Sequence, residues 1–165
     1  AVQWGKLLLN LNNPVNALSG LPLRAQLLDR DLRSTTAALI EEALTVLAAA
    51  RQRTTKVTPL PTRWLPRLLR LPTPVFRVLA ARMLKIDARA RSSMADDVAL
   101  GRRTEIDALC GEVVRLAKSL GRRAPRNEKM LGLMRYVELT AVAMGSPERA
   151  PTNPAELRQT IETAI

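Results

Sequence analysis

A lysine and two asparagines stand at helical spacing in the first stretch of the chain, WGKLLLNLNNPVNALSG. On a helix that advances about 100° per residue, Asn10 and Asn13 fall roughly 40° and −20° from Lys6, so the three share one face. An ammonium group and two carboxamides are costly to bury without partners. Two interpretations are open: a solvated face on a surface helix, or a site that presents a cation and amide groups to a small, oxygen-rich ligand.

A second polar group combines two expected helix starts. Ser93 and Asp97 belong to SSMADDVAL, and Glu105 follows in RRTEID. The N-terminus of a helix favours anions because its first N–H groups have no partner within the helix. Ser93 is therefore placed to receive a carboxylate, although ordinary capping accounts for the same residues. Asp96 and Asp97 are adjacent, point apart on a helix and make a poor metal pair.

Several kinds of chemistry are disfavoured by what the sequence lacks. It has no histidine, which removes the commonest general base and the commonest zinc ligand, and we expect no metal site. Proton transfer would have to use Lys, Glu, Asp, Tyr or water. No GxG occurs, so a dinucleotide would need another domain to hold its pyrophosphate. The single Cys110 excludes an internal disulfide, fits a reducing cytoplasm and is assigned no role.

The composition predicts one all-α domain over residues 1–165. Hydrophobic residues make up 47% of the chain and aromatic residues only 2%, so Leu, Ala, Val and Ile must fill the core, as in packed helices. No sustained period-2 alternation, signal peptide or apolar run of about 18 residues occurs. The chain begins inside a helical pattern without an initiator Met, which is typical of an excised domain.

Local signals place the helices. A first helix over 2–18 should kink or break at Pro14, and Asp31 is a plausible N-cap for a long helix over 32–50. Further helices are expected over 22–30, 62–70, 74–86, 92–100, 104–121, 127–144 and from 154, with a polar connection over 51–62. Their expected start signals are Ser92, a capping box from Thr104 to Asp107, Asn127, and Asn153 before Pro154; Gly101 and Gly121 are expected ends. The apolar face of 74–86 is expected to pack into the core or onto a membrane.

Positive charge is concentrated in the middle of the chain. The net charge is +11, and the segment 51–91 holds eleven Lys and Arg residues with one acid, Asp87. Such a segment suits nucleic acid, an anionic membrane surface or an anionic ligand. Only Trp64 and Phe76 could stack on bases there, and no zinc-finger or RNP pattern occurs. A basic all-α binding module for nucleic acid or an anionic surface therefore stays as the alternative, and a purely structural or dimerisation domain as a third.

Three segments together resemble a known family. WGKLLLN, RSSMADDVALGRRTEIDALCGEVVRLAKSLG and the Pro125–Asn127 pair are similar to the C-terminal domain of ketopantoate reductase (2-dehydropantoate 2-reductase). The resemblance implies an all-helical domain of the 6-phosphogluconate dehydrogenase C-terminal-like type, without the Rossmann domain that binds NADPH. It also implies the reduction of 2-dehydropantoate to pantoate in pantothenate and coenzyme A biosynthesis.

The implied partners are a small 2-oxo acid and the N-terminal Rossmann domain of the same protein, with a possible homodimer and with no nucleic acid or membrane. The NADPH-binding domain would be absent from this chain, so these 165 residues alone would be inactive. The expected location is the cytoplasm.

The resemblance also assigns roles to two charged residues. Lys6 matches the family's catalytic lysine, the general acid that protonates the ketone oxygen as hydride arrives. Glu105 matches the glutamate that completes the polar site. We therefore expect Lys6 and Glu105 to meet at one edge of a cleft.

Four further residues match positions on the substrate side. Asn10 matches the first substrate-side asparagine, Ser93 the serine near the substrate carboxylate, and Asp97 the acid four residues later. The family often has a second asparagine eight residues after the lysine. Here that position is Pro14, and Asn13 stands one residue earlier. Asn13 either replaces this contact or the contact differs.

Overall fold

The computed structural model describes residues 3–52, 61–82, 84–144 and 153–165, and within them it is helical without strands, as predicted. The α-helices are α1 (Trp4–Asn10), α2 (Asn12–Ser19), α3 (Leu23–Leu28), α4 (Arg30–Ala49), α5 (Leu65–Leu69), α6 (Thr73–Leu79), α7 (Ser93–Ala99), α8 (Cys110–Ser119), α9 (Pro125–Met144) and α10 (Pro154–Glu162). Two 3₁₀ helices are η1 (Thr62–Trp64) and η2 (Ile106–Ala108). Most of the polar connection expected over 51–62 lies outside the described residues.

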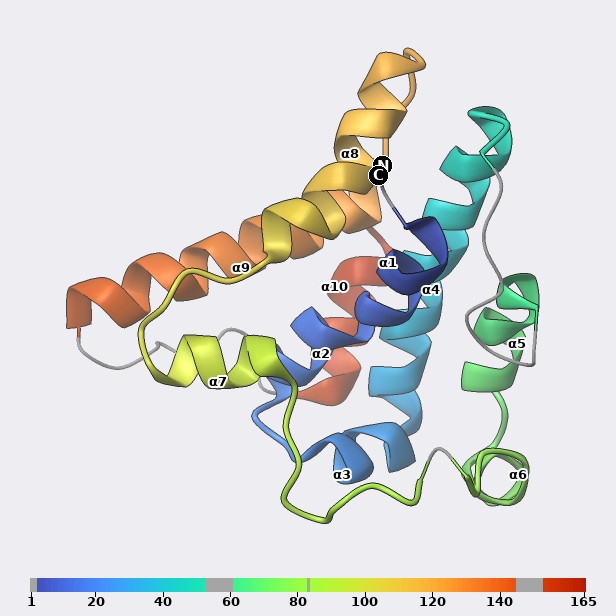
Figure 1. The fold of residues 1–165 in the computed structure, drawn as a ribbon, viewed down its shortest axis with the longest axis vertical. Helices are drawn as coiled ribbons and strands as arrows, with labels where there is room; N and C mark the ends of the chain where they lie inside the picture. Colours follow the sequence, from blue (N-terminus) through green and yellow to red (C-terminus); the bar gives the residue numbers. More distant parts are fainter. Residues whose placement is uncertain (1–2, 53–60, 83, 145–152) are drawn as a thin grey trace.

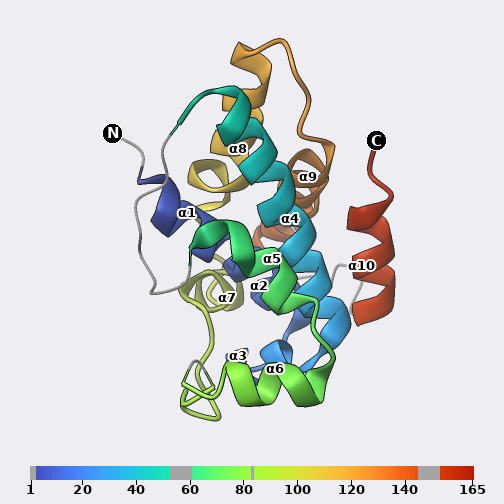
Figure 2. The same cartoon turned by 90° about the vertical axis from the view of Figure 1, so that its right-hand side faces the viewer.

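The long helix α4 is the centre of the fold. Its first half is buried on almost every side, which its small and aliphatic residues permit. α5 and α10 pack along it (Figure 1), and in the second view α1 and α10 lie on opposite sides of it (Figure 2). The predicted cap, Asp31, is wrong. The carboxylate of Asp29 accepts hydrogen bonds from Asp31 N and Leu32 N at 2.8 and 3.0 Å, while the Asp31 carboxylate binds Arg158 at 2.9 Å.

The helix expected over 2–18 is two helices, and the break comes before the proline. α1 ends at Asn10 and α2 begins at Asn12, so Leu11 is the junction. Pro14 is the third residue of α2, where a backbone N–H would have no intrahelical partner. Proline therefore fits inside the new first turn and does not interrupt it. Six apolar residues of this region are buried in the core: Trp4, Leu7, Leu8, Leu11, Val15 and Leu18.

Ser92 caps α7 as predicted, because its Oγ accepts a hydrogen bond from Ala95 N at 3.1 Å. Gly101 follows this helix at φ 63°. The capping box over 104–107 does not form. The Thr104 hydroxyl accepts from Ile106 N at 3.3 Å, and the Asp107 carboxylate binds Arg135 at 2.5 Å. This segment is therefore a turn and η2, and α8 begins only at Cys110.

Asn127 does not cap α9, which begins two residues earlier, at Pro125. The cap comes from α4: the Glu42 carboxylate accepts from Arg126 N at 3.0 Å and from Asn127 N at 2.8 Å. The buried Asn127 side chain donates to Leu39 O and Glu42 Oε2 and so ties the two helices together. The cap predicted for α10 is confirmed, since Asn153 Oδ1 accepts from Ala155 N at 3.0 Å.

α6 ends at Leu79, well short of the helix expected over 74–86, of which residue 83 lies outside the described residues. The apolar face expected to pack is exposed at Val75, Val78 and Leu79. Phe76 is the residue that enters the core. The Phe76 ring is thus the one large apolar group by which α6 enters the core, and the Thr73 hydroxyl accepts a hydrogen bond from Arg33 and donates one to Leu28 O, both at 3.3 Å.

Arg33 is a fully buried cation beneath that ring. Its guanidinium lies 4.3 Å from the centre of the Phe76 ring and donates to three backbone carbonyl groups, those of Leu27, Leu69 and Leu71, at 2.8 to 2.9 Å. Burial lowers the pKa of Arg33 from its ordinary value, and the nearby Asp29 opposes this shift. Arginine keeps its proton in such surroundings, so Arg33 joins the end of α3, the end of α5 and the start of α6.

Candidate active site

Lys6 and Asn10 lie one turn apart on α1. Lys6 is exposed and Asn10 is half-buried. Among the described residues, neither side chain has a recorded hydrogen bond or ion pair. The ammonium group of Lys6 therefore extends into solvent from a helix whose opposite face is buried.

A buried asparagine fixes α2 to the start of α7. The Asn16 side chain is fully buried, its Oδ1 accepts from Ser92 N at 2.9 Å, and its Nδ2 donates to Leu21 O at 2.9 Å. The Ser92 hydroxyl donates to the carbonyl oxygen of Asn13 at 3.4 Å. Two residues predicted for the site, Asn13 and Ser93, thus lie on segments that are hydrogen-bonded to each other. The Asn13 side chain is half-buried and that of Ser93 is exposed.

A second, partly buried network of amide groups joins α2 to α3 and α4. Asn12 and Gln26 exchange two side-chain hydrogen bonds, at 3.1 and 2.8 Å, and the Thr36 hydroxyl donates to Asn12 Oδ1 at 3.1 Å. Sequence reasoning missed Asn12 and Asn16. Their spacing of four residues was the available signal, but it indicates a shared face only after α2 is recognised as a helix of its own.

The backbone carbonyl groups of Asp97 and Glu105 both accept hydrogen bonds from residues that follow them in the chain. Arg102 N donates to the carbonyl of Asp97 at 2.8 Å, and Ala108 N donates to that of Glu105 at 2.9 Å. Glu105 is exposed just before η2. No ion pair between Lys6 and Glu105 is recorded in the described part of the chain, so their meeting at one cleft edge stays a prediction.

The described residues contain neither a Rossmann-type dinucleotide site nor a metal site. They contain no strand followed by a glycine-rich turn and a helix, which is the unit that cradles a pyrophosphate. Within the same ranges, no three His, Cys, Asp or Glu side chains gather as a metal site requires. Burial raises the pKa of the Cys110 thiol, which keeps it protonated and unreactive. None of the helices described is long and apolar enough to span a membrane.

The C-terminal domain of ketopantoate reductase, PanE/ApbA type, is the family whose model matches residues 1–138. The chain belongs to this family. The match includes every residue predicted for the site, from Lys6 to Glu105, and ends within α9. The resemblance inferred from the three sequence segments is confirmed, and with it the helical fold class.

A solved structure supports the same assignment. The crystal structure of a PanE/ApbA family ketopantoate reductase from Ralstonia eutropha JMP134 is similar to this chain, with 28% identity and a TM-score of 0.61. The similarity covers 83% of this chain and 40% of the other, so the chain spans less than half of that protein. No curated protein matches.

Proposed function

We propose that this chain forms the substrate-side helical part of an NADPH-dependent ketopantoate reductase, which converts 2-dehydropantoate to pantoate in the cytoplasm. The observation that carries the proposal is the family match, because it spans all six proposed site residues. The hydrogen bonds between α2 and the start of α7 add support, because they hold the segments that carry Asn13 and Ser93 next to each other.

Lys6 is the proposed general acid. Reduction of a ketone creates negative charge on its oxygen, and a positioned ammonium group stabilises that charge and supplies the proton. The exposed position of Lys6 on α1 leaves its Nζ available for this contact. Glu105, the second proposed catalytic residue, would orient the ammonium group by attraction.

The other four residues are proposed to bind the substrate. Asn10 lies one turn from Lys6 and would hold polar groups beside the reacting carbonyl. Ser93 and Asn13, which lie on either side of the α2–α7 junction, would hold the carboxylate end. Asp97 lies farther along α7 and would contact the hydroxyl end.

NADPH would supply the hydride from a Rossmann domain upstream of Lys6. The residues described here lack the Rossmann strand–turn–helix unit that holds the pyrophosphate of NADPH, so we assign the cofactor to that upstream domain. We propose that a 2-oxo acid enters between the two domains.

The test is NADPH oxidation with ketopantoate by this chain joined to its native upstream sequence. Lys6→Ala should lower kcat by roughly 10²- to 10⁴-fold, as expected for the loss of a general acid. Lys129→Ala is the matched control, because Lys129 is also exposed but lies on α9. Turnover in Lys6→Ala equal to wild type would overturn the role of Lys6. Turnover with another 2-oxo acid but none with ketopantoate would overturn the substrate assignment alone.

A further inference from the structure

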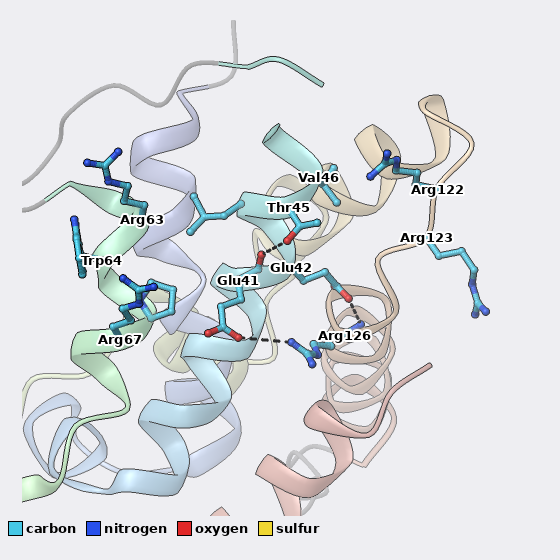
Figure 3. Close-up of a pocket in the computed structure, with 12 residues that line it drawn as sticks. Glu41, Glu42, Thr45, Val46, Arg63, Trp64, Arg67, Arg122, Arg123 and Arg126 are labelled. Carbon is cyan, nitrogen blue, oxygen red and sulfur yellow. Dashed lines mark hydrogen bonds and ion pairs between the residues drawn. The ribbon is translucent and has the colours of Figure 1, made fainter. Parts of the chain in front are cut away.

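An open groove of about 800 Å³ crosses the outer face of α4 (Figure 3). Glu41 lies on its floor, Arg67 and Trp64 stand on the wall formed by η1 and α5, and Arg122 and Arg126 come from the α8–α9 connection and α9. None of the residues proposed for the reductase site lines it. The groove is therefore a separate concave surface of the domain.

Its charge is strongly positive because its acids are already engaged. Glu42 accepts the first N–H groups of α9, and Glu41 is bound to Arg70, which lies outside the groove lining. Glu41 lies 3.9 Å from Arg126 as well. Over the described residues, four arginines of the lining have no recorded acidic partner: Arg63, Arg67, Arg122 and Arg123.

The arrangement of these cations limits the ligand. Arg122 and Arg126 extend from one wall toward α4, and Arg67 stands on the other wall with its guanidinium 4.7 Å from the centre of the Trp64 ring (Figure 3). Cations on two walls suit a ligand that carries negative charge at more than one position. A guanidinium group offers paired N–H donors that match the oxygens of a phosphate.

The rest of the lining is mostly apolar: Leu44 and Val46 of α4 and Pro66 of α5 stand beside one polar residue, Thr45. The volume lies in the range of about 300 to 1,000 Å³ that is typical of small-molecule sites. We propose that this groove binds a small molecule that carries at least two phosphate groups and an organic part. The proposal is independent of the reductase function, since the two sites share no residue and either can fail alone.

Tryptophan fluorescence provides a direct readout. The chain has two tryptophans, of which Trp4 is buried at 8% exposure and Trp64 is 43% exposed in the groove. Tripolyphosphate and ATP are titrated into the 165-residue chain at about 50 mM salt, where screening is weak, and calorimetry gives the Kd. We expect both to bind and to change the emission of wild type, and Trp64→Phe to abolish the change in emission.

The decisive variant reverses two groove cations, Arg67→Glu and Arg122→Glu together. We expect the Kd for tripolyphosphate and for ATP to rise by roughly tenfold or more, because two charge-assisted contacts are lost. The matched control, Arg77→Glu with Arg82→Glu, makes the same change in net charge at exposed arginines in and just after α6. Its Kd should rise much less than that of the groove variant, because Arg77 and Arg82 do not line the groove and make no direct contact with a ligand there. Circular dichroism verifies that both variants are folded.

The two probes separate the sources of affinity. Equal Kd values would indicate recognition of the phosphate chain, and tighter binding of ATP would indicate that the organic part also contacts the groove; both support the proposal. It is overturned if neither probe binds, or if the groove variant binds as wild type does. It is also overturned if the control loses as much affinity, or if only a single-stranded oligonucleotide binds.

Discussion

The junction of α2 with α7 and the arginine-lined groove hold their polar groups in different ways. At the junction, both ends of the buried Asn16 amide have partners, at Ser92 N and Leu21 O. In the groove, the arginines without acidic partners project from exposed positions, and the Glu42 carboxylate holds the start of α9. The junction therefore fixes positions, whereas the groove supplies charge.

This contrast has an energetic consequence. A buried polar group that loses its partner costs the full desolvation free energy, while an exposed charge contributes little to stability. Substitutions at the junction should therefore lower the free energy of unfolding, and substitutions of the groove arginines should not. The following variants test the contrast, in order of decreasing expected effect.

Asn16→Leu should lower the free energy of unfolding by about 2 to 4 kcal/mol, because it leaves Ser92 N and Leu21 O buried without partners. Urea denaturation measures the change. Asn13→Ala is the control, since the half-buried Asn13 side chain has no recorded hydrogen bond in the described structure, and it should cost less than about 1 kcal/mol. Equal losses for the two variants would contradict the structural role of Asn16.

Glu42→Ala should cost about 2 kcal/mol, because the first turn of α9 loses its acceptor and the buried Asn127 amide loses a partner. Glu41→Ala, one residue earlier in the same groove, removes only partly exposed ion pairs and should cost less than about 1 kcal/mol. Thermal unfolding of both variants gives the comparison. A larger loss for Glu41→Ala would show that the groove carboxylates have the opposite roles.

Two adjacent serines at the start of α7 have different expected roles: Ser92 stabilises the helix, and Ser93 is proposed to bind the substrate. Ser92→Ala should cost about 1 kcal/mol through the lost cap, and Ser93→Ala less than about 0.5 kcal/mol because Ser93 is exposed. In the reductase assay, Ser93→Ala should mainly raise the KM for the 2-oxo acid. An unchanged KM in Ser93→Ala would remove this serine from the proposed substrate contacts.

Arg122→Ser and Arg123→Ser should each change the free energy of unfolding by less than about 0.5 kcal/mol, since both side chains are exposed and have no recorded acidic partner in the described ranges. Chemical denaturation at low and high salt measures this. A loss of more than about 1 kcal/mol at either salt concentration would mean that these arginines hold the fold together.

Sequence signals predicted the fold where the cap and the helix belong to the same segment. Ser92 and Asn153 each accept a hydrogen bond from their own helix, and Gly101 and Gly121 have the positive φ angles, 63° and 64°, that suit a helix end. These contacts are made between residues that are neighbours in the chain, so they can be predicted from the sequence alone.

The signals failed where a distant residue replaced the local partner. Glu42 caps α9 from α4 in place of Asn127, and Arg135 binds Asp107, which leaves the expected capping box unformed. The projection of Lys6, Asn10 and Asn13 onto one helix assumed a continuous helix, but Leu11 separates α1 from α2. Lys6 and Asn10 are both on α1, so the predicted angle between them around the helix axis still holds. Asn13 is on α2, and its direction relative to Lys6 therefore depends on how α2 packs.

The buried Arg33 links the local unfolding of three helices, α3, α5 and α6. Its three carbonyl acceptors belong to segments far apart in sequence, around residues 27 and 69–71. If one of these segments unfolds alone, the buried guanidinium group loses a hydrogen-bond acceptor, which is costly. The corner made by α3, α5 and α6 should therefore open and close as one cooperative unit. In native-state hydrogen exchange, its amide protons would share one opening free energy, although α6 by itself is a short helix that places only one large apolar side chain, Phe76, in the core.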